Sequence, residues 1–230
     1  MIECLTKHFM KGPLRILDVG IGDGRYIGKV VTELDRAGIS ATVCGVDPSP
    51  ASARVVSKLF PAFEVTSQRF EDYYTREVFD VVIATHSLYY VDQAFNCLEK
   101  MVQLTKKGGI TISVLWSEQC ALYKIYKLYK DRCNFNGGNG FVTAESACAY
   151  LESLRNVDHV RQEHFHGRIV LSSWRNLPGM SDSACMIFSR DAGIQKNDKV
   201  HKEYVTSLRD VLNNFSDIEQ RVNGVIFVFR

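Results

Sequence analysis

The first half of the chain alternates short apolar segments with amphipathic ones, and this alternation limits the folds open to it. The predicted elements are a short helix over residues 2–10, strands over 15–19, 41–46, 63–66, 79–84 and 110–115, and helices over 25–37, 50–59 and 92–104. The unbroken apolar run at 79–84 is typical of a strand buried on both faces. Such alternation predicts an α/β fold whose sheet is mostly parallel, with helices on both faces and right-handed crossovers.

The second half is less regular, and its strands are expected to complete the sheet. The predicted elements are helices over 119–131, 144–154 and 199–213, one or two strands within 157–171, and a last strand over 224–229. Thr143 is a suitable N-cap for the helix that follows it. Residues 106–109 are predicted to form a turn, 134–140 a loop, and 174–190 have no clear pattern. The terminal VIFVF run is too apolar for an exposed edge strand.

These elements predict seven strands that end in an antiparallel hairpin, in a Rossmann-like sheet. A length of 230 residues suits one domain over 1–230, with a first half at 12–116 and a second half at 117–230.

Composition excludes several classes of protein. Hydrophobic residues make up 46% and charged residues 23%, so the chain is not disordered. The net charge of +2 provides no broad basic field for nucleic acid, and no apolar run is long enough to span a membrane. Charges at Glu3, Lys7 and Lys11 argue against a secretory signal. Seven cysteines without a CxxC pair predict reduced thiols and a cytoplasmic protein without a metal site.

The segment Ile16-Leu-Asp18-Val-Gly20-Ile-Gly22-Asp-Gly24-Arg25 carries most of the functional information. A strand ends in an acid, glycines follow at alternate positions, and a helix begins. Glycine permits positive φ and lets a ligand approach the backbone, while the helix N-terminus offers free N–H groups. Because the third glycine falls one residue too early for GxGxxG, a nicotinamide oxidoreductase is disfavoured, and the GK[ST] of a P-loop is absent.

This pattern resembles motif I of class I S-adenosylmethionine-dependent methyltransferases, and the resemblance covers residues 14–116. Asp47 closes the second strand, where an acid can accept hydrogen bonds from a ribose. Phe70-Glu71-Asp72 stands where the family contacts the adenine amino group, with either acid a candidate. The run from Phe79 to His86 is similar to the family's fourth strand, and Lys107-Gly108-Gly109 to its turn before the fifth.

A narrower resemblance is to the group of histamine N-methyltransferase and its relatives, through residues 46–49, 87–91, 122–130 and 224–229. It implies methyl transfer from S-adenosylmethionine, with S-adenosylhomocysteine (SAH) as product, to a small-molecule acceptor such as an amine or aromatic metabolite. The protein would act as a monomer or homodimer. The alternative is a catalytically degenerate partner or regulatory subunit of this fold. A nucleic-acid methyltransferase is disfavoured, because no Asn-Pro-Pro-Tyr-type motif follows the fourth strand.

The resemblance assigns roles to individual residues. The expected cofactor-binding residues are Asp18, Gly20, Gly22, Gly24, Asp47, Pro48, Ser49, Glu71, Asp72, Thr85 and His86. Asp18 would orient the loop or bind the methionyl ammonium group, and Pro48 and Ser49 would border the adenine.

His86 is the candidate catalytic residue, acting as a pocket wall, a hydrogen-bond donor or a base. The candidate substrate residues are Tyr26, Tyr89, Tyr90, Trp116 and Trp174. Aromatic faces there could hold an amine or a sulfonium by cation–π contact. One of Tyr89 and Tyr90 is expected to face the core.

Overall fold

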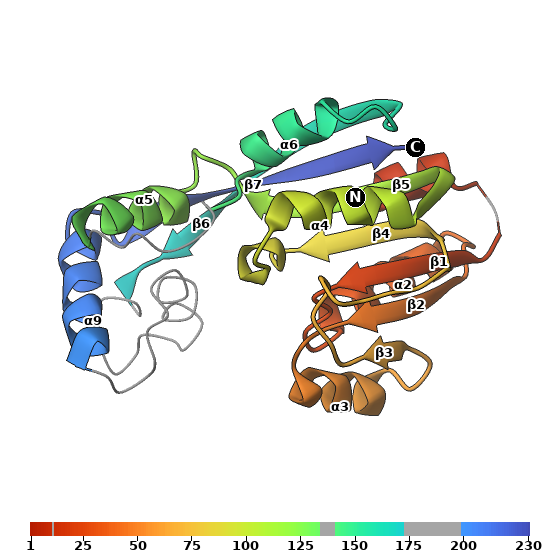
Figure 1. Cartoon of the computed structure of the whole chain (residues 1–230), viewed down its shortest axis with the longest axis horizontal. Coiled ribbons are helices and arrows are strands. Elements are labelled where there is room, and N and C mark those ends of the chain that lie inside the picture. The colour runs from red at the N-terminus through yellow and green to blue at the C-terminus, as the bar shows by residue number, and fades with distance from the viewer. Residues whose placement is uncertain (11, 134–140, 173–198) are drawn as a thin grey trace.

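A computed structural model of the chain contains one seven-stranded sheet in the order β3-β2-β1-β4-β5-β7-β6 (Figure 1). It describes residues 1–10, 12–133, 141–172 and 199–230. The first five strands pair in parallel, whereas β7 runs antiparallel to both β5 and β6. The strands are β1 (Leu14–Val19), β2 (Ala41–Val46), β3 (Glu64–Thr66), β4 (Phe79–Thr85), β5 (Thr105–Trp116), β6 (His159–Val170) and β7 (Ile218–Phe229). The predicted Rossmann-like, mostly parallel sheet with a closing antiparallel pair is confirmed.

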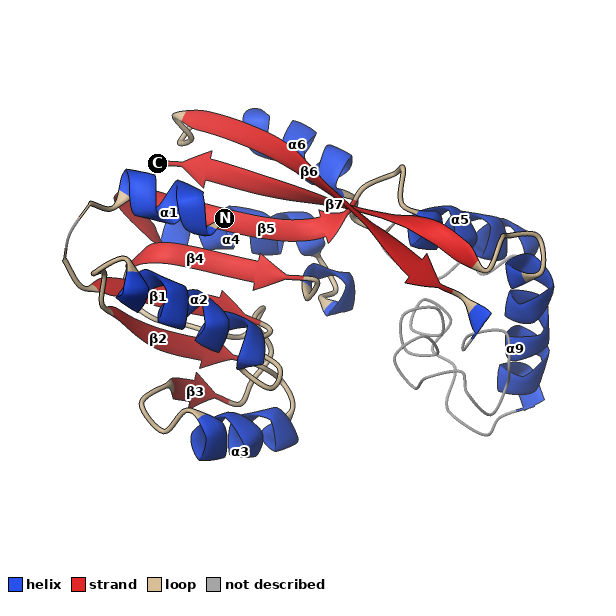
Figure 2. Ribbon diagram, turned by 180° about the vertical axis from the view of Figure 1, so that it is seen from behind, coloured by secondary structure: helices blue, strands red, loops and turns tan. Residues whose placement is uncertain are grey.

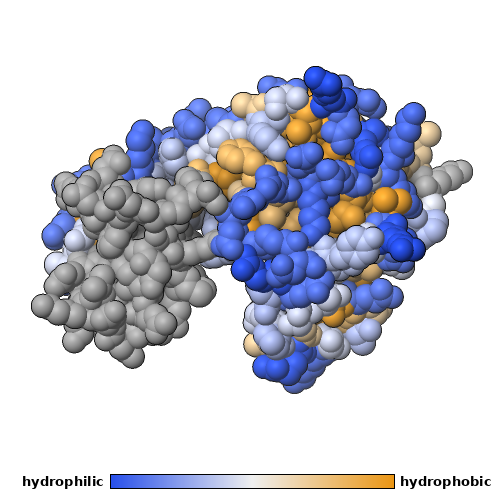
Figure 3. Space-filling model, viewed as in Figure 1, coloured by the Kyte–Doolittle hydropathy of each residue, from blue (hydrophilic) through white to orange (hydrophobic). Residues whose placement is uncertain are grey.

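Helices cover both faces of the sheet. On one face lie α1 (Ile2–His8), α2 (Arg25–Arg36) and α3 (Pro50–Leu59), with α1 and α2 in front in Figure 2. On the other lie α4 (Ala94–Leu104) and α6 (Ala144–Glu152). Two cores result, one on each side of the sheet. The surface on the α4 side mixes polar residues with small apolar patches (Figure 3). None of the described helices has the length and apolar composition that crossing a bilayer needs.

Local sequence signals explain where several helices begin. Gly24, with φ of 73°, precedes α2 as its N-cap. Ser49 caps α3 by accepting a hydrogen bond from Ser52 N–H, and Pro50 occupies the first helical position, where a missing N–H costs nothing. Thr143 and Ser146 form a reciprocal capping box at the start of α6. The predicted N-cap at Thr143 is therefore confirmed.

The strands β6 and β7 extend beyond the rest of the sheet. Residues 218–222 of β7 pair with 166–170 of β6 alone, because pairing of β7 with β5 begins at Asn223. At this extension lie α5 (Ala121–Cys133) and α9 (Lys199–Leu212), far from the β3 edge (Figure 1). A third core, including Trp116, Ile125 and Leu208, fills the space between them.

Two predictions differ from the structure in detail. Residues 106–109 form a bulge within β5 rather than a free turn: Thr105 pairs with Phe79, pairing resumes at Ile110, and Gly108 has φ of 79°. The last strand begins six residues earlier than residue 224, because its first part pairs only with β6. Residues 157–171, predicted to hold one or two strands, contain one. Trp174, the 134–140 loop and all of 174–190 lie outside the described residues.

Candidate functional site

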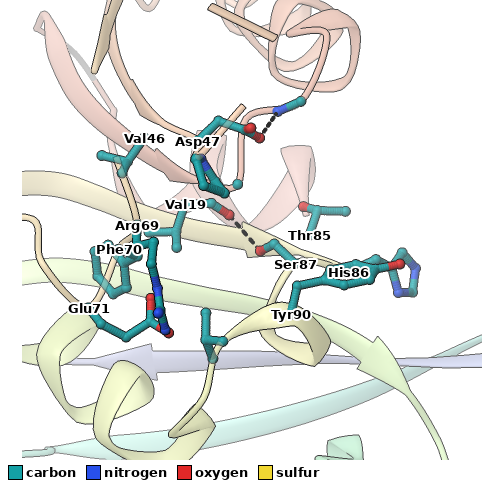
Figure 4. Close-up of a pocket in the computed structure, with 14 residues that line it drawn as sticks. Val19, Val46, Asp47, Arg69, Phe70, Glu71, Thr85, His86, Ser87 and Tyr90 are labelled. Atoms are coloured by element: carbon teal, nitrogen blue, oxygen red, sulfur yellow. Dashed lines mark hydrogen bonds and ion pairs between the residues drawn. The ribbon is translucent and has the colours of Figure 1, made fainter. Parts of the chain in front are cut away.

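A cavity of about 430 Å³ lies at the carboxyl ends of β1, β2 and β4 (Figure 4). This edge is where ligands bind in open α/β sheets. The segment after β3 and the short 3₁₀ helix η1 (Leu88–Tyr90) complete its walls. We call it the first cavity; its lining includes Gly22, Asp47, Phe70, Thr85, His86 and Tyr90.

The glycine loop forms one side of the first cavity, and its glycines are required for different reasons. Gly20 has φ of 77°, and a Cβ there would lie 2.3 Å from the Cβ of Ser87. Ser87 in turn donates a hydrogen bond from Oγ to the carbonyl of Val19 at 2.5 Å, which joins the ends of β1 and β4 (Figure 4). Gly22, with φ of 57°, would place its Cβ in open space. The loop therefore packs at Gly20 and leaves room at Gly22.

Asp47 holds the loop in place from the end of β2. Its Oδ2 accepts a hydrogen bond from Gly22 N–H at 3.0 Å, and its Oδ1 accepts one from Ser49 N–H at 2.9 Å. The side chain is largely buried and lines the first cavity. A carboxylate fixed by backbone donors in this way presents its remaining lone pairs to a ligand.

Asp18 is buried beside the cavity with no hydrogen-bond partner among the described residues. Only 4% of it is exposed. Desolvation, and then the negative charge of Asp47, raise the pKa of Asp18 to about 7. Strand alternation directs it to the α2 side of the sheet, because Leu17 and Val19 pack in the core on the opposite side. A cationic group placed here would stabilise the carboxylate.

The segment after β3 separates the two acids that the sequence left as alternatives. Glu71 lines the first cavity, whereas Asp72 is exposed and does not. Glu71 Oε1 accepts hydrogen bonds from Arg69 at 2.8 Å and from Asp92 N–H at 2.8 Å, and Arg69 also pairs with the Asp92 carboxylate. Burial opposes ionisation of Glu71, but the hydrogen bonds outweigh it and its pKa is lowered. Arg69 and Glu71 thus close one side of the first cavity, and both are hydrogen-bonded to Asp92.

His86 lies between the cavity and the third core, with an unusual backbone φ of 54°. Its Nδ1 is 3.2 Å from the Tyr89 hydroxyl, which accepts a hydrogen bond from Trp116 N–H at 2.5 Å. Burial, and to a lesser degree the charge of Arg221, lower the pKa of His86 to about 4. His86 is therefore neutral near pH 7 and poorly matched to act as a general base.

A second cavity, of about 350 Å³, lies on the α2 side and shares Thr85 and His86 with the first. Its lining includes Tyr26, Thr85, His86, Phe165, Arg221 and Asn223. Asn223 Oδ1 and Thr85 Oγ1 are buried there without hydrogen-bond partners. The two cavities therefore meet at the end of β4.

The structure brings most of the predicted site residues together. Gly20, Gly22, Asp47, Pro48, Glu71, Thr85, His86 and Tyr90 line the first cavity, and Tyr26 lines the second. Gly24, whose Cβ would lie 3.1 Å from both Phe60 and Val56, packs behind the loop, and Ser49 serves as the cap of α3.

Two of the predicted substrate residues require correction. Trp116 is 4% exposed and packs in the third core, where its ring lies 5.1 Å from that of Tyr89. Neither Trp116 nor Tyr89 lines the first or the second cavity, because the side chain of His86 lies between their rings and the two cavities. Tyr90 is the one of the tyrosine pair that faces a cavity, and Tyr89 the one that packs inward.

Sequence reasoning missed Arg69, Ser87, Arg221 and Asn223 as wall residues. Arg221 and Asn223 alternate along β7 with Val225, so all three reach one face of the sheet, and this period-two pattern was the available signal. No group of three or more metal-ligating side chains occurs in the described parts of the chain.

Part of the chain matches the sequence model of a known protein family. Residues 17–113 match the sequence model of a methyltransferase domain. An uncharacterized protein of Methanocaldococcus jannaschii is 25% identical over 154 residues, which cover 66% of this chain and 68% of that one. The matched domain spans β1 through most of β5 and therefore includes the glycine loop and Asp47.

Solved structures share the fold at low identity. The YcgJ protein of Bacillus subtilis has a TM-score of 0.63 at 11% identity, covering 100% of this chain and 97% of that one. The plantazolicin methyltransferase BpumL, solved in complex with SAH, has a TM-score of 0.57 at 12% identity, covering 100% and 81%. Part of this chain is therefore similar to a methyltransferase domain, and the solved structures share its fold.

Proposed function

We propose that this protein transfers the methyl group of S-adenosylmethionine to a small-molecule acceptor, an amine or an aromatic metabolite. The observation that carries the proposal is the pair of cavities that meet at Thr85 and His86. A transfer reaction needs two molecules held with their reacting atoms in contact. Two adjoining spaces with a common wall, one over a glycine loop, meet that requirement.

The residues of the first cavity fit the proposed cofactor. Gly22 leaves open space where a side chain would stand, and Asp47 offers carboxylate lone pairs suited to ribose hydroxyls. Asp18 is a buried carboxylate with no hydrogen-bond partner in the described parts of the chain, which suits the ammonium group of the methionyl part. Pro48 and Glu71 would border the adenine. The cavity volume is in the range of small-molecule sites.

The chain's contribution to the reaction is mainly positional. Bound S-adenosylmethionine supplies a methyl group already activated by the positive sulfur. Thr85 and His86 stand where the two cavities meet, so their side chains set the approach of the acceptor. The low pKa of His86 makes it a neutral hydrogen-bonding wall rather than a proton acceptor. An amine acceptor would release its proton to solvent.

The proposal also includes the cellular compartment and the oligomeric state of the protein. The described cysteines are free thiols, which supports a reducing compartment such as the cytoplasm. Methyl transfer to a small-molecule acceptor, as in the histamine N-methyltransferase group, requires no nucleic acid, membrane or heterologous partner. A monomer or homodimer therefore suffices for the proposed reaction.

Isothermal titration with SAH tests the proposal. The intact chain should bind SAH, and Asp47→Ala should weaken binding by roughly 1–3 kcal/mol, because the ribose loses its acceptor and Gly22 N–H loses a partner. Asp23→Ala is the matched control: Asp23 lies in the same loop but is exposed and, within the described part of the chain, pairs with Arg25 alone. Failure of the intact chain to bind SAH would contradict the proposal.

A turnover assay distinguishes an active methyltransferase from the alternative, a catalytically degenerate partner subunit. Labelled S-adenosylmethionine is incubated with pooled small metabolites, and methylated products are detected by mass spectrometry. Product formation that Asp47→Ala abolishes supports the enzyme. Tight SAH binding without any product would favour the catalytically degenerate partner subunit.

A further inference from the structure

The wall of the second cavity contains two polar atoms for which the described residues supply no hydrogen bond within 3.5 Å. Asn223 Oδ1 and Thr85 Oγ1 are both buried in its wall without a hydrogen-bond partner. Buried polar atoms are nearly always hydrogen-bonded in folded proteins. Two such atoms in one cavity indicate a ligand that offers hydrogen-bond donors to them.

Arg221 adds a positive charge to the same wall. It lies two residues before Asn223 on β7, and strand alternation directs both side chains into this cavity. Arg221 forms no ion pair with any described residue, and no carboxylate is among the residues that line the second cavity. Its charge reaches His86 in the shared wall. Arg221 is exposed, and an arginine beside a cavity with no ion-pair partner among the described residues is suited to binding a carboxylate.

We propose that the second cavity binds an acceptor that carries a carboxylate, with Arg221 pairing with the anion and Asn223 and Thr85 accepting hydrogen bonds from its hydroxyl or amino group. This inference rests on the proposed function and narrows its acceptor. The arrangement places the anion at the β7 side of the cavity. The nucleophilic oxygen or nitrogen then lies at Thr85, next to the first cavity.

A probe pair that differs only in charge tests this. Benzoate and benzamide are titrated against the full chain, with and without SAH, and binding is followed by ligand-observed NMR. Benzoate should bind about tenfold more tightly or better, as expected for a charge-assisted hydrogen bond. Arg221→Gln should remove that preference. Equal binding of the two probes, a preference that survives Arg221→Gln, or no binding of either would overturn the proposal.

Arg168→Gln is the matched control. Arg168 lies on β6 opposite Gln220, and alternation directs it to the other face of the two strands. It is exposed and lines neither cavity. This variant should keep the full preference for benzoate, and loss of the preference in it would contradict the assignment to Arg221. Thermal unfolding of both variants confirms that they fold.

The carboxylate could instead belong to the cofactor's own amino-acid tail, and a second comparison distinguishes the two sources. Methylthioadenosine shares the adenosine of SAH but lacks its carboxylate. If Arg221 binds the acceptor, Arg221→Gln leaves the ratio of SAH to methylthioadenosine affinity unchanged. A fall in that ratio would assign Arg221 to the cofactor and overturn the acceptor inference. If SAH does not bind the intact chain at all, the proposed function fails, while the benzoate comparison without SAH still tests Arg221.

Discussion

At the scale of the residue, the site depends on side chains and glycines that local structure alone does not require. Asp18 is buried with no partner among the residues that the structure describes, Gly22 faces open space, and His86 adopts a positive φ. The burial of Asp18 and the positive φ of His86 each cost stability in the absence of a ligand. Such features are expected where a protein keeps a site ready for binding.

Asp18 should make the stability of the protein depend on pH in an unusual direction. Its folded-state pKa of about 7 exceeds the ordinary value of 3.8 expected on unfolding. The contribution of Asp18 to the free energy of unfolding is therefore fully present below its unfolded-state pKa. That contribution is lost as the pH rises through its folded-state pKa. Asp18→Asn should remove this loss and raise the free energy of unfolding at mildly alkaline pH by on the order of 3 kcal/mol.

Urea denaturation from mildly acidic to mildly alkaline pH measures this effect. Asp35→Asn, an exposed change on α2, is the control and should follow the parent protein. The same Asp18→Asn variant should bind SAH more weakly, because the ammonium group loses its counter-charge. A parallel pH profile in Asp18→Asn and the parent would refute the argument.

Two glycine substitutions should separate packing from binding. In Gly20→Ala the new methyl would overlap Ser87, so we expect a loss of stability of about 2–4 kcal/mol. In Gly22→Ala nothing lies within 4 Å of the new Cβ. That variant should lose only about 1 kcal/mol of stability, from its left-handed φ. Its methyl group should nevertheless weaken SAH binding by about tenfold or more. Calorimetry measures both the stability and the SAH affinity of the two variants. A Gly22→Ala variant that binds SAH as tightly as the parent protein would show that the loop does not face the ligand.

At the scale of the element, local signals and tertiary contacts agree in most helices. Caps at Ser49 and Thr143 start α3 and α6 where the sequence places them. The exception is the bulge at residues 106–109, where two glycines suggest a free turn. There, Gly108 N–H donates to the Arg230 carbonyl, and the Arg230 guanidinium donates to the carbonyls of Val102, Gln103 and Thr105. These contacts with the end of the chain hold the segment against the sheet.

The capping box of α6 offers a prediction at this scale. Thr143 Oγ1 accepts a hydrogen bond from Ser146 N–H at 3.1 Å, and Ser146 Oγ accepts one from Thr143 N–H at 3.0 Å. Thr143→Ala should lower the free energy of unfolding by about 1 kcal/mol, whereas Thr143→Ser, which keeps the hydroxyl, should cost less. Thermal unfolding of the two variants provides the comparison. Equal losses would show that the methyl group, rather than the cap, stabilises this position.

At the scale of the whole molecule, β7 joins the two halves of the chain. It lies between β5 and β6, and its side chains reach all three cores. Its apolar sequence predicted an interior strand, and the structure confirms this. The strand also carries Arg221 and Asn223 into the second cavity. The architecture that completes the sheet therefore also completes the site.

Substitutions along β7 should show this central role. Ile226 is fully buried in the core on the α4 side, so Ile226→Ala should cost about 2–5 kcal/mol. Ile218, on the same strand, is 55% exposed, and Ile218→Ala should change stability by less than about 0.5 kcal/mol. Circular dichroism and tryptophan fluorescence should report the same transition in the parent and both variants. Separate transitions would indicate that the halves unfold independently.

The alternation of strands and helices, the glycine loop, and the acids at the ends of the first two strands could all be predicted from the amino-acid order. Each of these is a local pattern, since it depends on side-chain period, backbone freedom or the residue that ends a strand. The choice of Glu71 over Asp72, the burial of Trp116 and the meeting of Thr85 with Asn223 could not be predicted in this way. Those depend on which side chains a twisted sheet brings together across long stretches of chain, and periodicity carries no information about such contacts.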